Sequence, residues 1–404
     1  MIDLLKTLTV LFLIFILLRR RVFIGTVMAV GSVLLALLYL TPPADFMKGV
    51  YRALFSPRSL EMTSMLICTM IMENILRRTG TMRQMVASVA KIFPDPRFVM
   101  AAMPATIGLL PSVGGAVFSA PMVAEAAAGL EISAEQKSFI NYWYRHIWEY
   151  VSPLYPGIIL VSGMTGLSFR DLAVAHASYA AAVVLVGIPF CFRGLKPVVD
   201  RRVGESPLRA AAEFTLEISP IMLALALVIF WKVNPGLALG GAVLALFAWH
   251  RFTPARVVET LRESVSPKSV LLVAGVLLFQ ETLQGSGALQ GVTGFLAGSG
   301  LPLALLIMTI PFLAGVSTGL TVAFVGISFP FLLPLITVAG KVSPGLLALA
   351  FGGGFCGVML SPLHLCLVLS GEYFNADFGK VFRYLPVPSA LVLADGFIPF
   401  YLYS

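Results

Sequence analysis

Apolar residues fill most of this chain in long, nearly uncharged runs, and short segments rich in arginine, lysine, proline and glycine separate the runs. An apolar run of about 20 residues is long enough to cross a bilayer as an α-helix. In the first half of the chain the predicted spans cover, approximately, residues 4–18, 22–40, 60–76, 139–163 and 172–192. The pattern therefore predicts an all-α polytopic membrane protein.

A different pattern occupies residues 98–130, between the third and the fourth predicted span. This apolar stretch breaks at residues 110–115, which read Leu-Pro-Ser-Val-Gly-Gly. Each piece is too short to cross a bilayer, so we expect a re-entrant hairpin with its tip at membrane depth. Glycine lets a ligand approach the backbone closely. Ser112, Gly114 and Gly115 at the tip are therefore candidate binding residues.

The next span, residues 139–163, carries charge within apolar sequence. Arg145, His146 and Glu149 precede an interruption at Ser152, which a proline follows. Charge and irregular backbone at membrane depth are tolerated where they line a polar cavity, so we expect a polar substrate here. On a helix, Arg145 and Glu149 would lie one turn apart on one face. They form either a structural ion pair or a contact with an anionic substrate.

The same pattern recurs in the second half of the chain. Residues that flank spans and breaks have counterparts between 207 and 212 positions later, namely Thr41 with Thr253, Pro104 with Pro311, and Ser152 with Ser361. We therefore predict two repeats, each of five spans and one hairpin, at residues 1–192 and 213–404, with a polar linker at 193–212.

In the second repeat the predicted hairpin covers about 302–336 and the broken span about 344–370. The hairpin tip reads Val-Ser-Thr-Gly, and the broken span contains a second Ser-Pro interruption. The candidate binding residues of this repeat are Ser317, Thr318, Gly319, Ser361 and His364. Half-helix N-termini at such breaks favour an anion, and the carbonyl groups freed there suit Na⁺.

An odd number of spans in each repeat would insert the second repeat upside down relative to the first. The charges agree with this expectation, because linker 193–212 is rich in basic residues whereas segment 284–301 has no charge. Basic loops stay in the cytoplasm. We therefore expect broken helices at the interface of two inverted repeats, ten full spans plus two hairpins, and both termini outside a cytoplasmic (inner) membrane.

The composition supports a membrane protein and excludes several other classes. Hydrophobic residues make up 58% of the 404 residues and charged residues 12%, and the mean hydropathy is +0.92. Basic loops account for the net charge of +8, so we expect no nucleic-acid partner. The expected partners are the lipid bilayer and a small-molecule or ion substrate, and a homodimer is compatible with this plan.

Few residues suggest metal or cofactor chemistry. The four cysteines lie in apolar segments without CxxC or Cys/His spacing, so we interpret them as small buried hydrophobic side chains. We expect no cofactor and no metal other than Na⁺. Near the ends of their spans, Glu73, Asn74 and Glu281 are either candidates for a coupling-ion site or side chains that extend to the interface.

Two copies of a hairpin followed by a broken span resemble the ion transporter superfamily, which includes citrate, dicarboxylate and gluconate permeases and some Na⁺/H⁺ antiporters. The segments NYWYRHIWEYVSPLYPG and FGGGFCGVMLSPLHLCLVLSGEYF are similar to a membrane family catalogued as domain of unknown function 401. The resemblance spans essentially the whole chain. It implies an elevator-type carrier whose two hairpin tips hold substrate and coupling ions. The Ser-Asn-Thr tip signature of the dicarboxylate carriers is absent.

The sequence thus predicts a secondary active transporter that moves a small organic anion, coupled to Na⁺ or H⁺, by alternating access. An Na⁺/H⁺ or H⁺-coupled antiporter without an organic substrate is the first alternative. A membrane-embedded enzyme is the second, but no HExxH, GxSxG or paired-aspartate motif is present. A channel is disfavoured because inverted repeats with broken helices are typical of alternating access.

Overall fold

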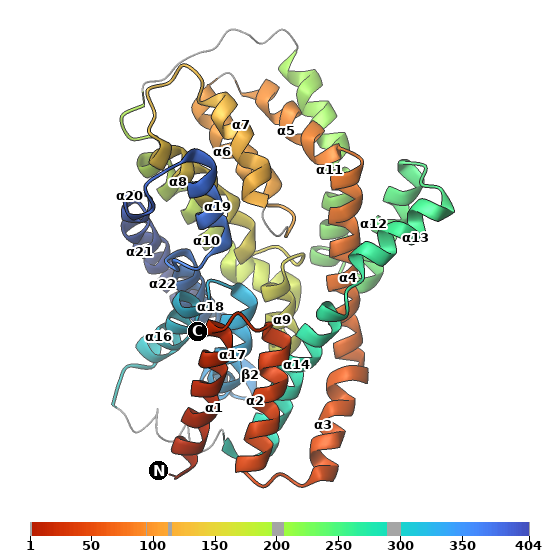
Figure 1. Ribbon diagram of the computed structural model, residues 1–404, viewed down its shortest axis with the longest axis vertical. Helices are drawn as coiled ribbons and strands as arrows, with labels where there is room; N and C mark the ends of the chain where they lie inside the picture. The colour runs from red at the N-terminus through yellow and green to blue at the C-terminus, as the bar shows by residue number, and fades with distance from the viewer. Residues whose placement is uncertain (1, 94, 112–114, 196–205, 289–299, 404) are drawn as a thin grey trace.

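The computed structural model describes residues 2–93, 95–111, 115–195, 206–288 and 300–403, and these residues are almost entirely α-helical (Figure 1). The helices of the first half are α1 (Ile2–Arg19), α2 (Ile24–Leu38), α3 (Pro43–Phe55), α4 (Pro57–Arg78), α5 (Thr81–Ile92), α6 (Pro96–Ile107), α7 (Gly115–Ala126), α8 (Ala134–Arg145), the 3₁₀ helix η1 (Ile147–Tyr150), α9 (Pro156–Thr165) and α10 (Phe169–Cys191).

The helices of the second half are α11 (Pro207–Ile229), α12 (Pro235–Trp249), α13 (Pro254–Ser264), α14 (Pro267–Gly285), α16 (Leu303–Thr318), α17 (Thr321–Ile336), α18 (Pro344–Met359), α19 (Leu365–Phe374), α20 (Phe378–Arg383), α21 (Pro386–Asp395) and α22 (Phe397–Tyr403). Two short antiparallel strands, β1 (Thr337–Val338) and β2 (Lys341–Val342), follow α17. The predicted all-α class is therefore confirmed.

Several helical segments are apolar enough to lie in a membrane. Within the described residues, Phe169–Cys191, Pro207–Ile229 and Phe378–Tyr403 are also long enough to cross one, and shorter apolar helices such as α12, α16 and α18 accompany them. This fits a multi-pass membrane protein. The count of ten spans and the orientation of the termini remain predictions.

Short polar residues before a proline fix where several helices begin. Ser56 Oγ accepts a hydrogen bond from the Ser59 nitrogen at the start of α4, and Ser343 Oγ accepts one from the Leu346 nitrogen at the start of α18, both at 3.2 Å. A proline occupies the first turn in each case. This arrangement satisfies an otherwise free backbone N–H group and uses the fixed φ of proline, so these starts are encoded locally.

Helices α16 and α18 approach each other closely because glycines line their contact. A Cβ atom at Gly357 would collide with the Phe312 carbonyl oxygen, and one at Gly315 would collide with the Gly354 carbonyl oxygen. In a membrane, small residues of this kind allow the backbone-to-backbone packing that holds helices together.

The two halves of the chain pack crosswise, which means that helices of one half contact helices of the other half. Helix α2 packs against α14 and α4 against α12, while α7 packs against α19 and α9 against α17. In Figure 1, α6 and α7 occupy the upper part of the molecule, and α16 and α17 lie in the lower part. The segments between α8 and α9 and between α18 and α19 meet near the middle, where side chains from both halves are in contact.

Candidate functional site

The candidate site lies where two helices are interrupted. Helix α8 ends at Arg145, and α9 begins eleven positions later at Pro156. His146, with φ −98° and ψ 9°, has left the helical conformation, and its nitrogen bonds the Trp143 carbonyl three residues back. Glu149 therefore lies in the tighter 3₁₀ turn. Arg145 and Glu149 are not one turn apart on one continuous helix, as the spacing alone suggested.

The second interruption separates α18 from α19. The Leu360–His364 segment joins them, and His364 is the N-cap of α19. His146 Nε2 and His364 Nε2 are 3.0 Å apart, so residues 218 positions apart in the chain are in direct contact. The two irregular segments thus form one site.

Charged and polar side chains surround this histidine pair. The Arg145 Nε donates to Cys366 Sγ at 3.4 Å, and Glu149 Oε1 lies 3.6 Å from His146 Nε2. The Thr321 hydroxyl, at the first residue of α17, donates to Glu149 Oε2 at 3.1 Å. We call this set the central cluster, and its members are Arg145, His146, Glu149, Thr321, His364 and Cys366.

The hydrogen-bond pattern fixes the tautomers of the two histidines. His146 Nδ1 lies 2.6 Å from the Tyr142 carbonyl oxygen, which can only accept, so Nδ1 carries a proton. In a neutral ring the Nε2 atom is then an acceptor. His364 Nε2 therefore carries the proton that lies between the two rings.

The central cluster is buried as well as polar. Arg145 is 3% exposed, His146 1% and His364 7%. Burying polar and charged groups costs several kcal/mol unless partners compensate. A group of such residues gathered at a backbone break is therefore the candidate functional site.

The turn between α16 and α17 contacts this site directly. Ser361 Oγ donates to the Val316 carbonyl at 2.7 Å, and Gly319 packs against the backbone of His364. Gly319 has φ +66°, a conformation that favours glycine. The Thr318 hydroxyl donates to the Ala314 carbonyl of its own helix at 2.8 Å, and Ser317 is half-buried.

Helices α6 and α7 approach the site from the first half of the chain. Ser112 and Gly114 lie outside the described residues, while Gly115 is the buried first residue of α7. Gly108, at the end of α6, lies so close to the Arg145 carbonyl oxygen that a Cβ atom would collide with it. The Tyr155 hydroxyl donates to the Gly108 carbonyl. Buried Ser152 accepts from the Leu154 nitrogen at 3.3 Å, within the interruption.

An amide network beside the central cluster was not predicted from the sequence. The Ser119 hydroxyl donates to Asn141 Oδ1 at 2.6 Å, and Asn141 Nδ2 donates to the Ala116 carbonyl at 3.0 Å and to Ser370 Oγ at 2.9 Å. It links α7, α8 and α19. The available signal was an asparagine one turn before Arg145, in the same apolar segment.

The three candidate coupling-ion residues pair with side chains outside the central cluster, Glu73 within α4 and the other two between helices. Glu73 pairs with Arg77 at 3.6 Å, and Glu281 with Arg52 at 3.4 Å. Asn74 Nδ2 donates to Ser264 Oγ at 3.0 Å, which joins α4 to α13.

Ion pairs also connect α4 and α13. Arg78 lies 2.9 Å from Glu259 and 2.6 Å from Glu263. The hydrogen bond and the charge of Arg78 hold the pKa of Glu259 below its ordinary value. These contacts give the ends of α4 and α13 a structural role.

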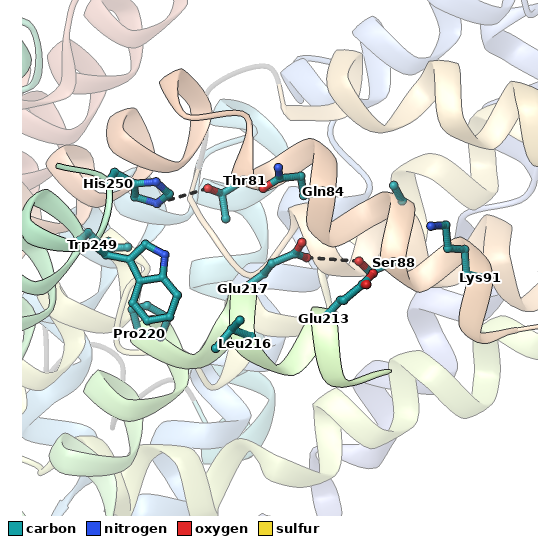
Figure 2. Close-up of a pocket in the computed structure, with 12 residues that line it drawn as sticks. Thr81, Gln84, Ser88, Lys91, Glu213, Leu216, Glu217, Pro220, Trp249 and His250 are labelled. Carbon is teal, nitrogen blue, oxygen red and sulfur yellow. Dashed lines mark hydrogen bonds between the residues drawn. The ribbon is translucent and has the colours of Figure 1, made fainter. Parts of the chain in front are cut away.

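A separate cavity of about 450 Å³ lies between α5, α11 and the end of α12 (Figure 2). Ser88 donates to Glu217 Oε2 at 3.4 Å across it, and Thr81 lies 3.5 Å from His250 Nε2. None of its lining residues belongs to the central cluster. We place the candidate site at the cluster because the cluster combines buried charge with backbone breaks from both halves.

The profile of a protein family described as "Protein of unknown function (DUF401)" matches residues 4–402, nearly the whole chain. None of the curated proteins matches this chain. Neither comparison names a substrate or an activity.

Proposed function

Because the chain belongs to the DUF401 family, whose function is unknown, we propose a function from the central cluster: secondary active transport of a small organic anion, coupled to Na⁺ or H⁺. Membership confirms the resemblance of the two segments that contain the interruptions. The wider ion transporter superfamily, the inverted repeats and the re-entrant hairpins are parts of the proposal.

A buried guanidinium at a helix break is the observation that carries the proposal. Arg145 is the last residue of α8 and is 3% exposed. A charge near the middle of a bilayer costs at least about 2.5 kcal/mol, so ionisable residues at that depth mark substrate or ion paths. The planar fork of a guanidinium matches a carboxylate better than any other side chain does. An organic carboxylate is therefore the proposed class of substrate.

Helix N-termini add to this preference for negative charge. Helix α19 begins at Leu365, directly after His364. Helix α17 begins at Thr321, whose hydroxyl donates a hydrogen bond to the Glu149 carboxylate. The free N–H groups and the dipole of a helix N-terminus attract anions. The site therefore combines a fixed cation with backbone donors.

The crosswise packing supports alternating access. Several contacts between the halves recur with the halves exchanged, as in α2 with α14 and α12 with α4, or α7 with α19 and α17 with α9. A pseudo-two-fold relation of this kind is expected of inverted repeats, which place the substrate at their interface. Two similar half-structures around one site can exchange roles, and that exchange opens the site to each side in turn.

The test is uptake into proteoliposomes. A panel of radiolabelled organic anions is offered with an inward Na⁺ gradient, with a pH gradient and with neither. We expect gradient-dependent uptake of at least one carboxylate, and loss of that uptake in Arg145→Gln. Arg209→Gln is the matched control, because Arg209 is exposed and pairs with Glu213 within α11.

Two other results would contradict this proposal. Collapse of an imposed pH gradient on addition of Na⁺, without uptake of any organic anion, would indicate an antiporter. Equal uptake by the parent protein and by Arg145→Gln would remove the guanidinium from the substrate site.

A further inference from the structure

We propose that the central cluster binds a transition-metal ion, Zn²⁺ or a chemically similar cation, through His146 Nε2, His364 Nε2 and Cys366 Sγ. One nitrogen of each ring and the sulfur all lie within 4.8 Å of one another, and the two Nε2 atoms are 3.0 Å apart. The sequence predicted no metal other than Na⁺, because the three residues do not form a recognisable motif. The fold brings His146 into contact with His364, which lies two positions before Cys366 and more than 200 positions after His146.

The donor set matches the chemistry of such an ion. Imidazole nitrogen and thiolate sulfur are the usual ligands of Zn²⁺, with bonds of about 2.0–2.1 Å and about 2.3 Å. Tetrahedral coordination would place two nitrogens about 3.3 Å apart, and a nitrogen and the sulfur about 3.6 Å apart. The histidine nitrogens are 3.0 Å apart, so they would separate by a few tenths of an ångström to admit the ion. The three donor atoms lie within 4.8 Å of one another, so the sulfur would move toward the nitrogens by at most about 1.2 Å.

His146 is already oriented as a ligand. Metal-binding histidines usually donate the N–H of their other ring nitrogen to a carbonyl or a carboxylate, which fixes the ring and its tautomer. The bond from His146 Nδ1 to the Tyr142 carbonyl does this and leaves the Nε2 lone pair facing His364.

His364 can adopt the matching tautomer. To bind a metal through Nε2, the ring must move its proton from Nε2 to Nδ1. The buried Nδ1 atom has no hydrogen-bond partner within the part of the chain that the structure describes. The proton can therefore move to Nδ1, and bonds from both Nε2 atoms to the metal would replace the hydrogen bond between the two rings.

The surroundings of Cys366 complete the site. Arg145 Nε donates to the sulfur at 3.4 Å, and a neighbouring cation favours the thiolate, which is the form that binds metals. Glu149 Oε1, 3.6 Å from His146 Nε2, can supply a fourth donor. The thiolate and the carboxylate would balance the charge of a divalent ion.

This inference goes beyond the proposed transport function and does not depend on it. It rests on the positions of three donor atoms from the two irregular segments, and its test needs no substrate. A protein that transports nothing can still bind the metal, and a protein that transports an anion can lack it.

The test uses the purified full-length protein, stripped with a chelator and titrated with Zn²⁺ by calorimetry and with Co²⁺ by absorption spectroscopy. We expect one ion for each chain and a thiolate-to-Co²⁺ charge-transfer band. Cys366→Ser should remove the band and weaken Zn²⁺ binding by roughly tenfold or more, equal to about 1.4 kcal/mol for each tenfold. Cys356→Ser is the matched control, because this buried cysteine of α18 is not one of the donors.

A monodisperse parent protein that binds no Zn²⁺ would overturn the inference. So would a Cys366→Ser protein with an unchanged Co²⁺ band and unchanged affinity, because the sulfur would then not be a ligand. If Cys366→Ser fails to fold, His364→Gln is compared with the parent instead. Loss of stoichiometric Zn²⁺ binding in that variant supports the site, and retained binding contradicts it.

Discussion

At the residue scale, Arg145 and Glu149 have different surroundings although they are close in the chain. Arg145 Nε bonds the sulfur of Cys366, whereas Glu149 accepts from Thr321 and faces His146. Helix α8 ends at Arg145, and Glu149 lies in the following 3₁₀ turn, so the two side chains do not share one helix face. Each is therefore placed by the second half of the chain, and an exchange of the two side chains would not preserve the site.

The exchange is a direct test of their roles. A protein with Arg145→Glu and Glu149→Arg should be folded and monodisperse but should lose uptake of the organic anion that the parent transports, because the guanidinium no longer lies beside Cys366. Size-exclusion chromatography measures the folding, and proteoliposome uptake measures the activity. Normal uptake by the exchanged protein would show that the pair is only structural.

Individual residues also show where sequence reasoning stops. The sequence singled out Arg145, Glu149 and His364, because charge within an apolar run is visible without a structure. Cys366 was interpreted as a hydrophobic side chain, since its partner is 221 residues away and no local pattern records that contact. The end of α8 at Arg145 was also missed, because the polar contacts that stabilise a 3₁₀ turn come from other elements.

At the element scale, helix starts were easier to predict than the packing between helices. A Ser-Pro pair marks the start of α4 and of α18, as the sequence alone suggests. The close approach of α16 and α18 depends on glycines that face a neighbour. Their sequence shows small residues but does not show which ones are in contact.

The contact between α16 and α18 gives a prediction for single glycines. Gly357→Ala should destabilise the protein by about 1–3 kcal/mol, because the added methyl group meets the Phe312 backbone and forces the helices apart. The unfolding temperature in detergent measures the effect. Gly241→Ala, on α12 with open space around it, should change stability little or raise it slightly, since alanine favours helix. Equal effects of both substitutions would contradict this account of the packing.

At the scale of the whole molecule, orientation in the membrane remains a prediction. In the proposed inverted arrangement the end of α14 faces outside and the start of α5 faces the cytoplasm. Gln284 and Arg83 are exposed at these two places. In intact cells, Gln284→Cys should react with an impermeant thiol reagent and Arg83→Cys should not, because the membrane protects it. Labelling is compared with that of the parent protein, which has only its own cysteines.

The opposite labelling pattern would place both termini in the cytoplasm. Labelling of both positions from outside would contradict the inverted arrangement itself. A C-terminal fusion that is active only outside the cytoplasm gives independent support to the first result.

The contact between Arg145 and Cys366 also has a consequence for biosynthesis. The two residues are 221 positions apart, and ribosomes add about 5–20 residues each second, so Arg145 enters the membrane roughly 10 to 40 s before its sulfur partner exists. Glu149 waits about as long for Thr321, which is 172 residues away. During this interval the charges of Arg145 and Glu149 lie in the first half of the chain without the second-half helices that later enclose them. The nascent protein therefore needs water or the insertion machinery beside α8 until the second half arrives.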